Sequence, residues 1–287
     1  MEGFNIEHLS YKSNNGKVLL DDISFMIQPN DRIAILGDNG AGKTTLMETI
    51  LGLNKTSKGT VFFNGDKMRS VPSKDVGIVW DYVEIFPWLK VSEIIRYFMA
   101  FHKTSSLNER IYQLLNIESI KNKLAKVLSR GENKKLAILL ATIPNPKYLF
   151  LDELSSNLDE SSLQTLWDGY LIHGKTILFS THNWEEANRY ANKYLFMSNG
   201  RILLPPMSKE DLIKTLPYAY KMVVNQEDFD IDKMSMPYCI CGGKYNIYIN
   251  ECDEEIIGKV SELTHNYSIL PIEISDIYAY HKINKRS

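Results

Sequence analysis

Short apolar runs alternate with amphipathic segments along most of the chain, up to about residue 204. Four runs are almost wholly apolar, which is typical of strands buried on both faces. They span residues 32–36, 76–80, 148–151 and 176–180. Apolar residues recur at helical spacing in four other segments, residues 43–51, 132–143, 161–170 and 184–191. Strands that alternate with helices predict a parallel sheet covered by helices.

The opening of the chain has a different pattern. Alternating apolar and polar residues at 4–9, 23–28 and 59–64, with an Asn14-Asn15-Gly16 turn, predict strands of an antiparallel sheet. Between residues 92 and 126 the apolar positions favour a long, mostly helical stretch. Further strands at 194–197 and 201–204 end this part of the chain.

The pattern changes again at Pro205 and Pro206, because a double proline cannot continue a strand ladder or a helix. We therefore predict two domains, residues 1–204 and 205–287. The second is predicted to be a small α+β domain with helices at 209–215, 253–265 and 275–281. Its predicted strands lie at 218–224, 238–241, 245–250 and 267–272.

Composition narrows the classes of function. The formal net charge of −2 gives no bulk basic charge for binding nucleic acid. No apolar run approaches the roughly 20 residues that cross a bilayer, and no signal pattern opens the chain. The three cysteines suit reduced thiols in the cytosol. A zinc site of Cys239, Cys241, Cys252 and His265 has unusual spacing, and buried cysteines are the favoured interpretation.

The strongest motif runs from Gly37 to Thr44 and fits G-x-x-x-x-G-K-[ST] between a predicted strand and a predicted helix. Glycines let the backbone approach phosphate oxygens, and the helix N-terminus attracts anions. Lys43 is expected to reach the β- and γ-phosphates, and Thr44 to ligate Mg²⁺. The residues expected to bind the nucleotide here are Gly37, Asn39, Gly40, Ala41, Gly42, Lys43, Thr44 and Thr45.

Two carboxylates follow the buried strand at 148–151, at the end where ligands bind in α/β sheets. Asp152 is placed to hold Mg²⁺. Glu153 is placed to polarise an attacking water as a general base. Many strands end in acids, so this pair gains its meaning from Lys43.

Five further elements appear in order with these motifs, and together they resemble the nucleotide-binding subunit of an ATP-binding-cassette (ABC) transporter. The stretch from Leu128 to Glu132 stands in the place of the LSGGQ signature, with Ser129 and Glu132 as a capping box. The other elements are Tyr11 as an adenine platform, Asp81 in the place of the Q-loop glutamine, Ser156-Asn157-Leu158-Asp159 as the D-loop, and His182 as the switch histidine. Tyr11 alone would as readily be a packing residue, and His182 alone a structural one.

The resemblance covers about residues 3–204 and implies a P-loop NTPase fold, with a parallel core sheet, an antiparallel β subdomain and a helical signature subdomain. It implies ATP and Mg²⁺ as cofactors, with Glu153, His182 and Asp81 as catalytic residues, and Asp81 also near the metal. It further implies a head-to-tail dimer, with itself or a related ATPase. In such a dimer Ser129, Gly131 and Asp159 of one copy face the nucleotide of the other.

The resemblance also implies separate membrane-embedded permease subunits, contacted through about Glu84 to Trp88, which would hold the protein at the cytoplasmic face of the membrane. Three departures from the family pattern are Asp81 for Gln, Arg130 for Gly and Leu154 for Pro. A basic residue in the signature and an acid in the place of the Q-loop glutamine resemble the pattern in the ATPases of small ABC-2-type exporters of Gram-positive bacteria.

For such exporters the favoured cargo is an amphipathic or antimicrobial peptide, such as a phenol-soluble modulin or a bacteriocin, although no residue here shows it. Two alternatives stay open. One is a soluble ABC ATPase in protein assembly or translation, and the other is a nucleotide-sensing module that does not hydrolyse ATP.

Overall fold

The computed structural model describes residues 2–72, 74–82, 85–228, 238–250, 254–264 and 266–284. Contacts divide the chain into two compact units, residues 1–206 and 207–287. The predicted division lies two residues earlier, between 204 and 205. In the described ranges, no helix combines the length and the apolar composition that crossing a bilayer requires.

A six-stranded sheet forms the centre of the first unit, in the order β10-β9-β3-β8-β7-β6. Within this sheet β3 pairs in parallel with β8 and β9, and β7 pairs in parallel with β6 and β8. Side chains of β7 and β8 are buried at every position, which explains their unbroken apolar runs. The strand bounds are β3 Arg32–Leu36, β6 Val76–Val79, β7 Tyr148–Asp152, β8 Thr176–Ser180, β9 Lys193–Ser198 and β10 Arg201–Met207.

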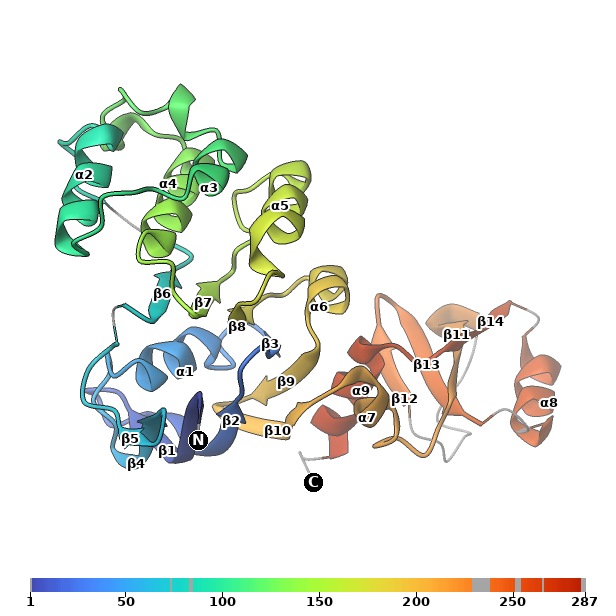
Figure 1. The fold of residues 1–287 in the computed structure, drawn as a ribbon. Helices are drawn as coiled ribbons and strands as arrows, with labels where there is room; N and C mark the ends of the chain where they lie inside the picture. The colour runs from blue at the N-terminus through green and yellow to red at the C-terminus, as the bar shows by residue number, and fades with distance from the viewer. Residues whose placement is uncertain are drawn as a thin grey trace. The chain divides into compact units, whose positions relative to one another are not determined.

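Helices alternate with the strands of this sheet along the chain, as the pattern predicts (Figure 1). They are α1 Lys43–Ile50, α4 Arg130–Thr142, α5 Glu160–Leu166 and α6 Trp184–Tyr190. A π-helical turn, Trp167–Leu171, follows α5 directly. Because parallel strands end at one edge of the sheet, the segments after β3, β7 and β8 gather there.

An antiparallel sheet in the order β2-β1-β4-β5 packs against the same core. Phe4 of β1 lies edge-on to Tyr148 and Phe150 of β7, at 5.3 and 5.4 Å between ring centroids. The strands are β1 Phe4–Lys12, β2 Val18–Ile27, β4 Lys58–Phe63 and β5 Asp66–Lys67. The predicted antiparallel β subdomain is therefore present.

The stretch between residues 92 and 126 is a set of short helices rather than one long one (Figure 1). Lys103 and Asn116 adopt positive φ angles of 54° and 52°, a conformation that ends a helix. Asn108 starts the next helix, because its side chain accepts a hydrogen bond from the Ile111 N–H. The helices are α2 Val91–Phe101 and α3 Glu109–Leu114, followed by the 3₁₀ turns Ile117–Ser119 and Ala125–Val127.

The prediction that Pro205 and Pro206 stop the strand is wrong, because β10 continues through both to Met207. The reason is its position, since β10 lies at the edge of the sheet. A proline in an edge strand can direct its missing N–H away from the ladder.

The second unit is an α+β fold, as predicted. Its antiparallel sheet has the order β12-β13-β11-β14, and its core includes Met222, Ile247 and Val260. The strands are β11 Tyr220–Asn225, β12 Tyr238–Cys241, β13 Lys244–Ile249 and β14 Tyr267–Pro271, and the helices are α7 Lys209–Ile213, α8 Glu254–Leu263 and α9 Ile274–Asn284. Cys239 is buried and accepts a hydrogen bond from the Tyr248 hydroxyl. The Cys252 and His265 of the zinc hypothesis lie outside the described residues.

Candidate active site

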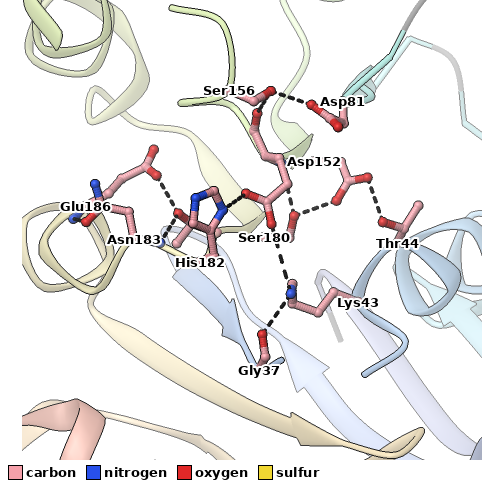
Figure 2. A network of polar contacts seen from close by, with 12 residues as sticks. Gly37, Lys43, Thr44, Asp81, Asp152, Ser156, Ser180, His182, Asn183 and Glu186 are labelled. Atoms are coloured by element: carbon pink, nitrogen blue, oxygen red, sulfur yellow. Dashed lines mark hydrogen bonds and ion pairs between the residues drawn. The ribbon is translucent and has the colours of Figure 1, made fainter. Parts of the chain in front are cut away.

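The loop from Gly37 to Thr44 joins β3 to α1 at the carboxyl edge of the six-stranded sheet. Lys43 is buried, and its Nζ donates to the Gly37 carbonyl at 2.8 Å and the Asp38 carbonyl at 3.3 Å (Figure 2). Gly42 caps α1 with a φ of 104° and offers no side chain to the first turn of the helix. A Cβ at Gly37 would lie 2.3 Å from the Met197 carbonyl oxygen, so only glycine fits.

Asp152 ends β7 with both carboxylate oxygens engaged and only 3% of its surface exposed. Oδ2 accepts from the Thr44 hydroxyl at 2.8 Å, and Oδ1 accepts from the Ser180 hydroxyl at 2.5 Å. The predicted pair of Thr44 and Asp152 therefore meets, although 108 residues separate the two in sequence. Hydroxyl and carboxylate oxygens of this kind are the donors that Mg²⁺ takes. Ser180 is a site residue that the sequence reasoning did not single out.

Glu153 lies between a cation and a histidine. Its Oε2 is 2.7 Å from His182 Nδ1, and its Oε1 is 4.0 Å from Lys43 Nζ. The backbone of Glu153 is held at a φ of 46°, and its N–H donates to Ser180. A strained backbone of this kind at the end of a buried strand is typical of a functional position. Lys43, Glu153 and His182 thus meet at one point, as the sequence predicts.

Asp81 follows β6, and its carboxylate contacts the D-loop and α4. Oδ1 accepts from the Ser156 hydroxyl (Figure 2). The same oxygen lies 3.8 Å from Lys134 Nζ. The same Ser156 hydroxyl is 2.7 Å from the Glu153 carbonyl oxygen. Asp81 therefore contacts the turn from Glu153 to Ser156. The hydrogen bond between Thr44 and Asp152 does not involve Asp81.

Three comparisons with known proteins bear on this geometry. The family profile described as ABC transporter matches residues 20–156. The cell division ATP-binding protein FtsE of Streptococcus pneumoniae is 30% identical over 207 residues, which cover 67% of this chain and 90% of FtsE. This chain belongs to the ABC transporter family.

Other relatives have different named tasks. The Nod factor export ATP-binding protein I of Burkholderia thailandensis is 31% identical over 201 residues, 66% of each chain. A spermidine/putrescine import ATP-binding protein of Legionella pneumophila is 31% identical over 206 residues, 67% of this chain and 56% of its own length. The chain thus spans less than two thirds of those two proteins. Membership of the ABC transporter family sets neither the direction of transport nor the substrate.

Solved structures agree on the fold. The ATP-binding subunit of an ABC transporter superposes with a TM-score of 0.66 at 22% identity, over 74% of this chain and 92% of that one. An ATP-binding cassette was solved as a dimer in a post-hydrolysis state with ADP and Pi. It superposes with a TM-score of 0.62 at 20% identity, over 71% of this chain and 98% of that one. The chain therefore carries an ABC ATPase domain.

The ABC signature segment begins α4 with the predicted capping box. The Ser129 hydroxyl accepts from the Glu132 N–H at 3.2 Å, and Glu132 Oε2 accepts from the Ser129 N–H at 2.9 Å. The Lys123 ammonium and the Ser129 N–H hold the pKa of Glu132 below its usual value. A Cβ at Gly131 would lie 2.6 Å from the Asn157 carbonyl oxygen, so the signature and the D-loop pack closely.

The remaining predicted residues have local contacts. Asp159 is the N-cap of α5 and accepts from both the N–H and the hydroxyl of Ser162, and these bonds hold its pKa below the usual value. Tyr11 is half-buried and packs against the core. In the loop, Asn39 and Gly40 are exposed and Ala41 is buried, while the Thr45 carbonyl accepts from Thr49 inside α1. The adenine role of Tyr11 and the nucleotide role of Asp159 stay predictions.

Lys134 is a second polar residue of the site, besides Ser180, that sequence reasoning missed. It lies one turn into α4, and only 4% of its surface is exposed. The detectable sign was its spacing, because position 134 shares a helix face with the apolar residues Ala137 and Ile138. A lysine on such a face needs partners within the protein.

Proposed function

We propose that this chain is the ATP-binding and ATP-hydrolysing subunit of an ABC exporter. The observation that carries the proposal is the meeting of Lys43, the Thr44–Asp152 pair and the Glu153–His182 pair at one edge of the sheet. Phosphoryl transfer needs a cation, a magnesium-binding set and a group that orients water. Lys43, the Thr44–Asp152 pair and the Glu153–His182 pair are side chains suited to these tasks, and the contacts described above among them are 4.0 Å or less.

Each side chain then has a separate task. Lys43 and the N–H groups at the start of α1 bind the β- and γ-phosphates. Thr44 and Asp152 would hold Mg²⁺, and the carboxylate of Asp81, which contacts Ser156 here, is the third candidate ligand. A bound Mg²⁺ neutralises developing charge on the phosphates. Glu153 Oε2 accepts the proton of the attacking water, and the imidazole of His182 fixes that carboxylate.

The second half of each site comes from another copy of the chain or a related ATPase. The capping box begins α4 at Ser129, which is exposed, and the N-terminus of a helix attracts a phosphate. Ser129, Gly131 and Asp159 of one copy face the ATP bound by the other, so that ATP closes the dimer and hydrolysis opens it. The ABC cassette with ADP and Pi described above is itself a dimer.

An exposed aromatic surface supports docking to a membrane-embedded permease. Tyr82 is 78% and Trp88 74% exposed, and Tyr97 and Phe101 of α2 are also exposed. Phe86 and Tyr97 contact edge to face at 5.4 Å between ring centroids. Ile85 of the same stretch is buried instead, with 8% of its surface exposed. Glu84, the first residue of the predicted contact, lies outside the described residues. Large exposed apolar patches mark interaction sites.

Export of amphipathic peptides is the proposed task, at the cytoplasmic face of the membrane. A mild-detergent pull-down of the tagged chain from its own membranes tests it. We expect a polytopic membrane protein at about one copy per cassette, lost on the change Trp88→Ala while ATP turnover in the purified chain stays unchanged. Recovery of soluble partners only would favour the soluble ATPase.

A further inference from the structure

Lys134 is a nearly buried cation at the junction of three segments of the first unit. Its Nζ donates to the carbonyl oxygens of Trp80 at 3.0 Å, Asp81 at 3.3 Å and Asp152 at 3.2 Å. An ammonium has three protons to donate, and these three carbonyls account for them. The Ser156 hydroxyl lies a little further away, at 3.5 Å.

The three segments otherwise belong to different parts of the fold. Trp80 and Asp81 follow β6, Asp152 ends β7, and Ser156 lies in the D-loop before α5. Lys134 itself belongs to α4, four residues after its first residue. One side chain therefore links the signature helix to both strand ends that carry the acidic residues of the site.

Burying this charge is unfavourable unless partners compensate. Burial lowers the pKa of Lys134, while the carboxylates of Asp81, Asp152 and Glu153 oppose that shift. A methionine would fill a similar space but could not donate to the carbonyl oxygens of Trp80, Asp81 and Asp152. The ammonium at this position therefore joins α4 to the strand ends that carry Asp81 and Asp152.

We propose that Lys134 is a positioning residue for ATP hydrolysis, which holds Asp81 and the Glu153–Ser156 turn in register with the signature helix. Movement of α4 is then transmitted through Lys134 and Ser156 to the backbone of Glu153. Lys134 touches no residue of the loop from Gly37 to Thr44 among its hydrogen bonds in the described chain, so it acts on turnover rather than on ATP affinity. The inference rests on the proposed hydrolytic function.

A matched control exists on the opposite edge of the sheet. Lys175 precedes β8, and its Nζ donates to the Pro146 carbonyl at 2.7 Å and to Asn145 Oδ1 at 2.8 Å. Burial lowers its pKa as well. The change Lys175→Met thus removes a similar desolvated lysine far from the carboxyl ends of the strands.

Steady-state ATPase kinetics of Lys134→Met, Lys134→Gln and Lys175→Met test the role. For Lys134→Met we expect kcat to fall about tenfold or more while KM for ATP stays within about twofold. Lys134→Gln keeps N–H donors and should lose less, and Lys175→Met should lose nothing. An unchanged kcat for Lys134→Met, or a KM that rises in proportion, would overturn the inference.

A double-mutant cycle with Asp81→Asn separates positioning from general damage. If Lys134 acts through Asp81, the double variant should lose no more turnover than the worse single variant. Losses that multiply would contradict the coupling.

If the wild-type chain showed no ATP turnover, that result would count against the proposed function. The positioning role would then be tested by a different measurement. Hydrogen exchange of residues 153–157 serves for this, because Lys134→Met should accelerate it and Lys175→Met should not. Equal exchange in both variants would overturn the positioning role.

Discussion

The two halves of the proposed ATP site are built in different ways. In the phosphate half, side chains from distant segments contact one another, as Lys43, Glu153 and His182 do. In the signature half, Ser129 and Asp159 bond to residues only three positions away, as ordinary helix caps do. The phosphate half is therefore a complete arrangement within one chain. In the proposed dimer, the signature half gains a function only when a second copy supplies the phosphate.

Among changes in the phosphate half, Lys43→Ala should have the largest effect on ATP binding. It removes a buried ammonium that lies 4.0 Å from Glu153. A charge-assisted contact to phosphate contributes about 1.5–3 kcal/mol, so ATP affinity should fall roughly 10- to 100-fold. Calorimetric titration with ATP measures it. Unaltered ATP affinity would contradict the proposal that the loop from Gly37 to Thr44 binds the phosphates.

The change Gly131→Ala should affect the signature half alone. The added Cβ would lie 2.6 Å from the Asn157 carbonyl oxygen, so α4 and the D-loop must separate. We expect kcat to fall about tenfold while ATP affinity of the single chain stays unchanged.

Gly258→Ala in α8 is the matched control, because a Cβ there meets nothing within 4 Å. Its turnover should equal that of the wild type. If Gly131→Ala weakened ATP binding by the isolated chain, the two halves would not be separable as described.

The change Glu132→Gln should have the smallest effect, on stability. The pKa of Glu132 is lowered in the folded protein, so its carboxylate stabilises the fold above its ordinary pKa of 4.5. That contribution is lost as the pH falls through the lowered value. At pH 7 we expect the variant to be about 0.5 kcal/mol less stable to urea. The gap should close in strong acid, and a gap of constant size would contradict this account of Glu132.

Local motifs made the phosphate half predictable. The segment from Gly37 to Thr44 carries its own geometry, and Asp152 and Glu153 follow a strand whose apolar run identifies it. The fold class follows in the same way from alternating strands and helices. These features depend on neighbours along the chain.

What could not be predicted depends on contacts between distant segments. Ser180 reaches Asp152 across two neighbouring strands, and Lys134 gathers carbonyls from segments up to 54 residues away. The continuation of β10 through Pro205 depends on its edge position in the sheet, which the sequence pattern does not encode. The breaks after α2 and α3 rest on the positive φ angles of Lys103 and Asn116.

The central claim is that Glu153 drives hydrolysis in a dimer that ATP assembles. The most direct test is the mass of Glu153→Gln in solution with and without ATP, measured beside its turnover. The account predicts that kcat falls by about 10²- to 10⁴-fold and that ATP converts the variant to a stable dimer. Turnover at the wild-type rate would remove Glu153 from the base role. A variant that binds ATP, fails to hydrolyse it and stays monomeric would contradict the proposed dimer.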